Sequence, residues 1–199
     1  MLGRAGSVTE RSQVVLASAS PRRRWLLAKL GVPFTVQAVD LDERPHGGEA
    51  PAPFAERMAR EKATAATARA VGSWVLAADT VVALDARALG KPRDAADAIA
   101  MLLALAGRIH TVYTAVALAR PDGALAEALL VDTEVTFRPL VAREVEAYVA
   151  SGEPFGKAGA YAIQGEGAHL VDRVHGSYTN VIGLPLAEVA SCLAKWQIR

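Results

Sequence analysis

The chain has 199 residues, a formal net charge of +1, 52% hydrophobic residues and 22% charged residues. These values fit one domain with a substantial core, exclude a disordered chain, and leave no basic excess for bulk nucleic-acid binding. The single cysteine, Cys192, excludes an intramolecular disulfide and is expected to be a buried thiol in a C-terminal helix.

Residues 1–12 contain charged side chains and lack the apolar segment of a secretory signal, so we expect a flexible N-terminal extension there. The folded domain is then expected over 13–199. No apolar stretch reaches the roughly 18 residues that a membrane span needs. We therefore expect a cytoplasmic protein without a membrane partner.

The first predicted unit is a strand over 13–17, a short turn, and a helix over 21–30. Ser20 is predicted to cap this helix, with Pro21 at its first position. The first turn also contains cations, which the helix dipole disfavours, at Arg22, Arg23 and Arg24. Two interpretations are open: a solvated basic helix start, or a binding site for a strongly anionic group such as a polyphosphate.

A second strand is predicted over 34–39, and an acidic segment follows it at 40–45. This segment is either a solvated loop or a source of ligands for a divalent metal, since Mg²⁺ takes one or two carboxylates together with substrate phosphates. A helix is predicted next, over 53–70. Its pattern taken alone favours a surface position for Lys62.

The run over 74–84 is apolar on both faces, which is typical of a central strand, yet Asp79 stands in its middle. Burying an unpaired carboxylate costs on the order of several kcal/mol, so proteins pair it or bind it to a metal. Asp79 is therefore a candidate functional residue. The alternative is a structural aspartate that is paired with an arginine or caps a turn.

The remaining elements are predicted as a turn over 85–89, a helix over 94–106, strands over 110–119 and 129–138, a helix over 140–150, strands over 168–174 and 178–182, and a last helix to Trp196. Lys91 lies between a glycine and a proline, a stiff setting that suits close approach to a ligand. A glycine-dense tract over 152–167 either allows such an approach or forms a flexible surface loop.

Several common site motifs are missing from the sequence. It contains no GxGxxG and no GxxxxGK[ST], which argues against Rossmann and P-loop sites. It contains no GxSxG, and its four histidines lack the spacing of a zinc site.

Together, the segments resemble the Maf family, the septum-formation-inhibitor-like nucleoside triphosphate pyrophosphatases. The resemblance covers nearly the whole chain and rests on these motifs in order: LASASPRR (16–23), DERP (42–45), AREKA (59–63), AADTVV (77–82), GKPRDAADA (90–98), KAGAYAIQG (157–165) and GLP (183–185). Each motif is weak alone, but their joint order is specific.

The resemblance implies an α/β fold with a mixed central sheet flanked by helices, in an elongated two-lobed single domain with a central cleft, similar to ITPase folds. It also implies hydrolysis of a nucleoside triphosphate to the monophosphate and pyrophosphate with a divalent metal, Mg²⁺ or Mn²⁺, and a possible homodimer. The chain resembles the dTTP/UTP branch rather than the 7-methyl-GTP branch at Pro21, at 78–80 and at 163–165.

The resemblance also assigns roles to residues. The proton-accepting aspartate falls on Asp79, and the metal would be held by Glu43 and Asp79. Phosphate-binding positions fall on Ser18, Arg22, Arg23, Lys62, Lys91 and Lys157. Positions that select the base fall on Arg22, Thr80 and Gln164. The chain departs from the family pattern at Gly156, where an acidic residue is common before the lysine, and at Ala162.

The expected role is therefore the removal of dTTP, UTP or modified pyrimidine nucleotides from the nucleotide pool. Two alternatives from other classes are open. One is a nucleotide-binding regulator of cell division whose hydrolysis is incidental. The other is a nucleotidyltransferase, in which a second phosphorylated substrate replaces water.

Overall fold

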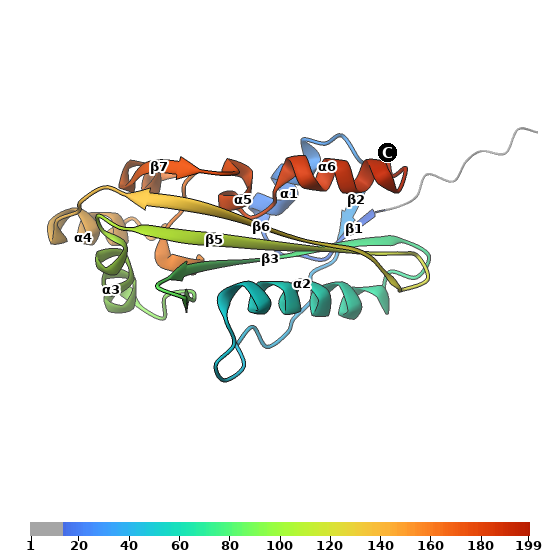
Figure 1. The fold of residues 1–199 in the computed structure, drawn as a ribbon, viewed down its shortest axis with the longest axis horizontal. Helices are drawn as coiled ribbons and strands as arrows, with labels where there is room; N and C mark the ends of the chain where they lie inside the picture. Colours follow the sequence, from blue (N-terminus) through green and yellow to red (C-terminus); the bar gives the residue numbers. More distant parts are fainter. Residues whose placement is uncertain (1–13) are drawn as a thin grey trace, which may run out of the picture.

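The structure is a computed structural model, and it describes residues 14–199 (Figure 1). The predicted N-terminal extension over residues 1–12, and the predicted domain boundary at residue 13, lie outside the described residues. The domain is elongated, and its long strands run along its length (Figure 1).

The centre of the domain is a seven-stranded mixed sheet with the order β2-β1-β3-β5-β6-β7, in which β4 pairs with β3 alone. Strand β1 pairs in parallel with β2 and β3, and the other pairings are antiparallel. The strands are β1 (Val14–Leu16), β2 (Phe34–Val36), β3 (Trp74–Leu84), β4 (Arg87–Leu89), β5 (Ile109–Ala119), β6 (Leu125–Phe137) and β7 (Val171–His175). The predicted mixed α/β architecture is confirmed.

Helices cover both faces of this sheet. They are α1 (Pro21–Ala28), α2 (Pro51–Thr67), α3 (Ala95–Leu105), α4 (Ala142–Ala150), α5 (Tyr178–Ile182) and α6 (Leu186–Lys195), with 3₁₀ turns η1 (Ala158–Ala160) and η2 (Glu166–Leu170). Helix α2 lies along one face, α1, α5 and α6 lie on the other, and α3 and α4 lie at one end (Figure 1).

Strand β3 separates two cores, because successive side chains of a strand point to opposite faces. Val75, Ala77 and Val81 pack in the core beneath α2. Leu76 and Val82 pack in the larger core on the opposite face, which also contains Cys192. The prediction of a buried thiol is thus confirmed. By the same alternation, Asp79 faces α2 and Thr80 faces α1.

The segment Tyr178–Ile182 is the clearest wrong prediction, because it forms helix α5 rather than a strand. Ser177 caps this helix by accepting a hydrogen bond from the backbone N–H of Asn180. The Asn180 side chain donates to the Val112 carbonyl and to Thr133 Oγ1, at 2.9 Å each. These partners on β5 and β6 are distant in sequence, so the local pattern did not reveal them.

Other strand boundaries also differ from the prediction, and β2, predicted to reach residue 39, ends at Val36. The predicted strand over 168–174 is divided between η2 and β7. Strand β6 begins at Leu125 rather than near residue 129, because a tight turn at 120–124 starts its pairing with β5 early. Among the described residues, no helix is both long enough and apolar enough to span a membrane.

Candidate active site

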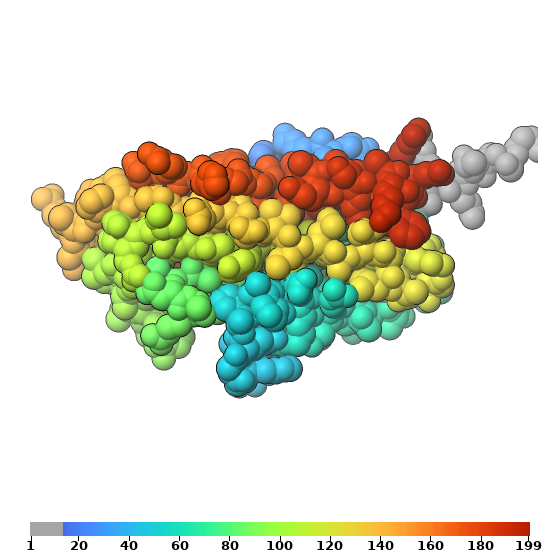
Figure 2. All heavy atoms as spheres, in the orientation of Figure 1, coloured from blue at the N-terminus to red at the C-terminus, as the bar shows by residue number. Residues whose placement is uncertain are grey.

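A cleft of about 740 Å³ opens between the segments that flank β3. It is lined by every site residue that the sequence predicted: Ser18, Arg22, Arg23, Glu43, Lys62, Asp79, Thr80, Lys91, Lys157 and Gln164. In the space-filling view an indentation separates the cyan segment that leads into α2 from the green segment around α3 (Figure 2). Pro45 lines the cleft from the segment before α2, Phe54 from the first turn of α2, and Gly90 and Lys91 from the residues that precede α3.

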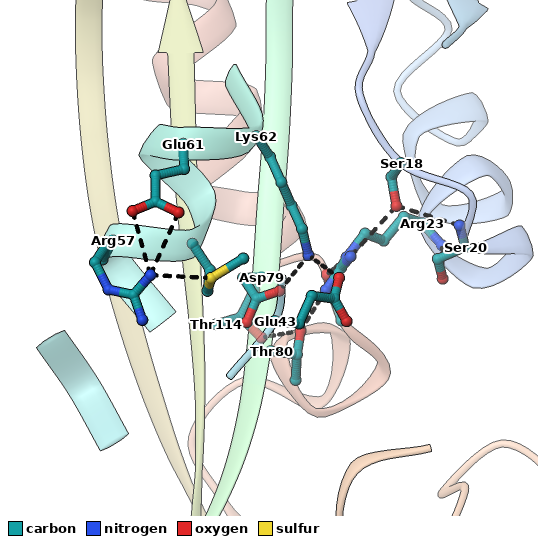
Figure 3. Close-up of polar contacts among 12 residues, drawn as sticks. Ser18, Ser20, Arg23, Glu43, Arg57, Glu61, Lys62, Asp79, Thr80 and Thr114 are labelled. Atoms are coloured by element: carbon teal, nitrogen blue, oxygen red, sulfur yellow. Dashed lines mark hydrogen bonds and ion pairs between the residues drawn. The ribbon is translucent and has the colours of Figure 1, made fainter. Parts of the chain in front are cut away.

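Lys62 joins two carboxylates at the centre of the cleft. Its Nζ lies 2.6 Å from Asp79 Oδ1 and 2.6 Å from Glu43 Oε1 (Figure 3). Lys91 Nζ lies 2.6 Å from the other oxygen, Glu43 Oε2. Two lysines and two carboxylates therefore form one alternating chain of charges across the cleft.

The surface position that the helix pattern alone favoured for Lys62 is wrong. Lys62 is 5% exposed and belongs to the stripe of α2 that packs on the sheet, with Met58, Ala59 and Ala66 as its buried neighbours. A charged amine is tolerated in this stripe because Asp79 faces it from β3 and compensates the cost of burial.

Glu43 is the part of the acidic segment that reaches the cleft. Burial acts to raise its pKa, but the hydrogen bonds from Lys62 and Lys91 outweigh this effect and lower the pKa of Glu43 to about 2. Asp42 points elsewhere and forms an exposed ion pair with Arg44. The two interpretations of this segment therefore divide between neighbouring residues: Asp42 is solvated, and Glu43 faces the cleft.

Arg23 is held at the start of α1 by contacts from three segments. Its Nε donates to the Gly183 carbonyl at 2.9 Å, and its terminal nitrogens donate to Thr80 Oγ1 at 2.9 Å and Ser18 Oγ at 3.3 Å. Burial lowers the pKa of Arg23, while the negative charge of Asp79 opposes that shift. The guanidinium therefore points into the cleft in a fixed orientation (Figure 3).

The turn before α1 has the capping arrangement that the sequence predicted. Ser20 caps the helix by accepting from the Arg23 backbone N–H, and Pro21 occupies its first turn. Of the basic residues in this turn, Arg22 and Arg23 line the cleft and Arg24 does not. The anionic-site interpretation thus fits two of the three arginines.

Lys157 and Gln164 line another part of the cleft, on the loop that follows α4. The Lys157 ammonium donates to the backbone carbonyl of Glu153. Burial and the nearby charge of Arg22 lower the pKa of Lys157. The lysine thus has a fixed backbone partner even though Gly156 replaces the acidic residue common in the family pattern.

Sequence reasoning missed groups that hold the site together. Thr114 on β5 contacts Thr80 Oγ1 at 3.0 Å and donates to the Asn180 carbonyl at 3.0 Å. Gly183 was noted only as part of the GLP motif, and its carbonyl binds Arg23. Nothing in the local sequence marks Thr114, since a threonine in a strand is ordinary.

The fold and the cleft define an α/β protein with a concave site in which arginines and lysines surround the buried carboxylate of Asp79. The sequence profile described as Maf-like protein matches residues 13–196. The chain belongs to the Maf family.

Two named relatives match nearly the whole chain. It is 57% identical over 186 residues to the dTTP/UTP pyrophosphatase of Myxococcus xanthus (strain DK1622), covering 94% of this chain and 93% of that protein. It is 52% identical over 188 residues to the dTTP/UTP pyrophosphatase of Geobacter sulfurreducens (strain ATCC 51573 / DSM 12127 / PCA), covering 94% of this chain and 97% of that protein.

A solved structure of a HAM1 protein from Coxiella burnetii has a similar fold. The TM-score is 0.50 at 17% sequence identity, and the match covers 92% of this chain and 99% of that chain. At this identity the likeness shows the fold alone.

Proposed function

We propose that this protein is a nucleoside triphosphate pyrophosphatase that hydrolyses dTTP and UTP to the monophosphate and pyrophosphate. The observation that carries the proposal is the buried Asp79, linked through Lys62 to Glu43, in a cleft lined by further cations. The relatives named dTTP/UTP pyrophosphatase support the choice of substrate.

In the proposed reaction, Asp79 accepts one proton from a water molecule that attacks the α-phosphorus. A bond forms between the water oxygen and phosphorus, and the bond from phosphorus to the α–β bridging oxygen breaks. The electron pair of that bond leaves with pyrophosphate, and the second water proton stays with the monophosphate. Asp79 suits this role because, among the described residues, it is the buried carboxylate that lines the cleft.

The cations of the cleft are proposed to bind the triphosphate and to stabilise the charge that develops on the leaving group. Arg23 has the most fixed orientation, since it contacts Ser18, Thr80 and a backbone carbonyl. The other groups are Arg22, Lys62, Lys91 and Lys157. Lys91 is exposed and pairs with Glu43, so we expect it to exchange this partner for phosphate when substrate binds.

The carboxylates of Glu43 and Asp79 fit a Mg²⁺ or Mn²⁺ site that also uses phosphate oxygens. Among residues 14–199 no group of three or more His, Cys, Asp or Glu side chains could hold a metal ion by itself. This agrees with the preference of Mg²⁺ for one or two carboxylates plus substrate phosphates and waters. The bound ion would polarise a phosphoryl oxygen and neutralise part of its charge.

Selection of the base is proposed to rest on Gln164, Thr80 and Arg22. A side-chain amide can pair with the adjacent O and N–H groups of a uracil-type edge. The hydroxyl of Thr80 accepts a hydrogen bond from Arg23, so we propose that Thr80 also orients this arginine toward the phosphates.

The test is pyrophosphate release with Mg²⁺ from dTTP, UTP, CTP, GTP, ATP and 7-methyl-GTP. We expect selective turnover of dTTP and UTP, and a loss of at least about 100-fold in kcat for Asp79→Asn. The matched control is Asp42→Asn, which makes the same change at an exposed aspartate and should keep wild-type kinetics.

Turnover of Asp79→Asn within about tenfold of wild type would contradict the assignment of the base. Tight nucleotide binding without turnover would instead support the regulator of cell division. A requirement for a second phosphorylated acceptor would identify a nucleotidyltransferase. We also propose that the protein forms a homodimer and acts in the cytoplasm, and sedimentation of the purified protein tests the first of these proposals.

A further inference from the structure

Glu153 is outside the lining of the cleft and outside the family motifs, yet its carboxylate binds the loop that contains Gln164. Its Oε1 accepts the backbone N–H of Glu166 at 3.1 Å, and its Oε2 accepts the backbone N–H of Gly167 at 2.8 Å. Oε2 also accepts the hydroxyl of Tyr148 at 2.8 Å. One side chain thus satisfies three donors, two of them backbone groups just beyond Gln164.

A related contact holds the backbone two positions before Gln164, at Ala162. The Tyr148 hydroxyl accepts the backbone N–H of Ala162 at 3.1 Å. Tyr148 and Glu153 together therefore fasten the backbone on both sides of the tripeptide 163–165. The backbone carbonyl of Glu153 also accepts the Lys157 ammonium, so the same residue contacts a second group of the cleft.

Gly165 supplies independent support, because a side chain at this position would occupy the place of the Glu153 carboxylate. A Cβ built on Gly165 would lie 1.7 Å from Glu153 Oε1 and 2.6 Å from its carboxyl carbon. The φ of Gly165 is −116°, outside the left-handed region that favours glycine. The glycine is therefore needed for the space that the carboxylate fills, rather than for its backbone conformation.

The carboxylate is suited to this role by its charge. Burial acts to raise the pKa of Glu153, but the hydrogen bonds from Gly167 and Tyr148 outweigh it, and the pKa stays below its ordinary value. Glu153 is thus ionised at neutral pH. Hydrogen bonds from backbone N–H groups to an ionised carboxylate are stronger than those between neutral groups.

We infer that Glu153 is a positioning residue, which fixes the loop 162–167 and Lys157 against the cleft and so sets both affinity and base selectivity. This inference rests on the proposed function, in which Gln164 contacts the base and Lys157 the phosphates. Glu153 acts through these two side chains and need not touch the nucleotide itself.

The first experiment compares steady-state kinetics of wild type and Glu153→Gln with UTP and CTP. Glutamine has nearly the same shape as glutamate, but its NH₂ group replaces one of the two accepting oxygens. At least one of the hydrogen bonds from the backbone N–H groups of Glu166 and Gly167 is therefore lost. We expect KM for UTP to rise roughly tenfold, which is the size of effect that the loss of one charge-assisted hydrogen bond produces. We expect kcat to change less than about threefold and the preference for UTP over CTP to shrink.

The matched control is Glu146→Gln, an exposed position on α4, for which we expect wild-type kinetics. A fall in kcat without a change in KM or in selectivity would indicate only a smaller folded fraction and would overturn the inference.

The second experiment is a double-mutant cycle with Gly165→Ala and Glu153→Ala. Gly165→Ala alone should raise KM for UTP about as much as loss of the carboxylate, because its Cβ displaces that group. In the Glu153→Ala background, Gly165→Ala should raise KM for UTP by a further factor of less than about two. Effects that multiply in the double variant would overturn the inference, because the two positions would then be independent.

Amide hydrogen exchange separates this inference from the proposed function. In Glu153→Gln at least one of the two amides, of Glu166 or Gly167, should exchange at least about tenfold faster, with the amides of β5 unchanged. Unchanged exchange at those two amides overturns the inference, whatever the activity. Faster exchange in a protein whose wild type hydrolyses no nucleotide would support the loop contact and reject the proposed function.

Discussion

At the scale of single residues, the amine of Lys62 matters most for stability, because it pairs with the carboxylates of both Asp79 and Glu43. Replacing it by methionine, Lys62→Met, leaves Asp79 buried beside Glu43 without the cation that both share. Removing one partner of a buried ion pair typically costs about 3–5 kcal/mol. Because Glu43 is partly exposed and keeps Lys91, we expect the lower end, about 3 kcal/mol, in urea unfolding at pH 8.

The double variant Lys62→Met with Asp79→Asn separates the charge effect from simple loss of packing. It removes both buried charges, so we expect it to recover most of the stability that Lys62→Met loses. A loss below about 0.5 kcal/mol in the single variant, or a simple sum in the double variant, would show that the pair is not coupled.

His110 gives a prediction about acid stability. The ring is 2% exposed and its Nε2 contacts the Tyr161 hydroxyl at 2.9 Å, while among the described residues Nδ1 has no hydrogen-bond partner. Burial lowers the pKa of His110 to about 4 from an ordinary value of 6.5. The unfolded chain therefore binds the proton more tightly than the folded one.

The free energy of unfolding should consequently fall by roughly 2–3 kcal/mol as the pH drops from about 6.5 toward 4. Above about pH 6.5 His110 is neutral in both states, so the free energy of unfolding should no longer depend on pH through this group. Urea unfolding of wild type and His110→Gln at pH 7.5, 6.5, 5.5 and 4.5 measures this. The loss between pH 6.5 and 4.5 should be absent from the variant, whatever its stability at pH 7.5. Parallel profiles would contradict the buried neutral histidine.

At the scale of elements, the turn between β3 and β4 combines sequence and backbone in an unfavourable way. Asp85 and Ala86 join Leu84 to Arg87 and have φ values of 49° and 61°. Two-residue hairpin turns with positive φ favour glycine, since a Cβ there is strained. We expect Ala86→Gly to raise the free energy of unfolding by about 0.5–1 kcal/mol.

The control for this turn is the same substitution where φ is negative. Ala68 is exposed at the C-terminal end of α2 with a φ of −59°. Ala68→Gly should lower stability, by about 0.5–1 kcal/mol, because glycine there only adds freedom to the unfolded chain. Changes of the same sign at both positions in thermal or urea unfolding would refute the argument from backbone strain.

Long elements were predictable because their patterns are local. The two-sided apolar run of β3 and the spacing of α2 indicate their type without knowledge of the fold. Helix α5 was mistaken for a strand because it is only five residues long and is held by Asn180 contacts to β5 and β6. Such contacts between distant residues leave no period in the sequence.

The candidate site shows the same contrast between features that local sequence reveals and contacts between residues that are distant in sequence. The motifs identified the residues that line the cleft, because the resemblance to the family assigned each role to a numbered position of this chain. The contacts between motifs were not predictable: Lys62 bridges two carboxylates from separate segments, and Glu153 fastens a loop from outside the lining. Pairing of this kind depends on which face of β3 each residue occupies and on how the loop after α4 returns to the sheet.

At the scale of the whole molecule, the cleft joins segments that are far apart in the chain. Its lining comes from the start of α1 and the turn before it, from α2 and the segment before it, from β3, from β4 and the residues after it, from the loop after α4, and from the end of α5. A ligand that contacts all of them requires the folded arrangement and has no binding site in the unfolded chain. Nucleotide binding should therefore stabilise the entire fold rather than one loop.

The final prediction follows from this linkage. A UTP analogue with a non-hydrolysable α,β-imido bridge, at about 100 times its Kd with Mg²⁺, should stabilise the protein by about 2.7 kcal/mol. For a domain of this size that corresponds to a rise in Tm of roughly 5–10 °C in differential scanning fluorimetry. Uridine at the same concentration should give little shift, because the cations of the cleft have no phosphate to bind. Equal shifts with uridine and with the analogue would show that the base dominates binding, and would contradict the polyphosphate site around Arg23, Lys62 and Lys157.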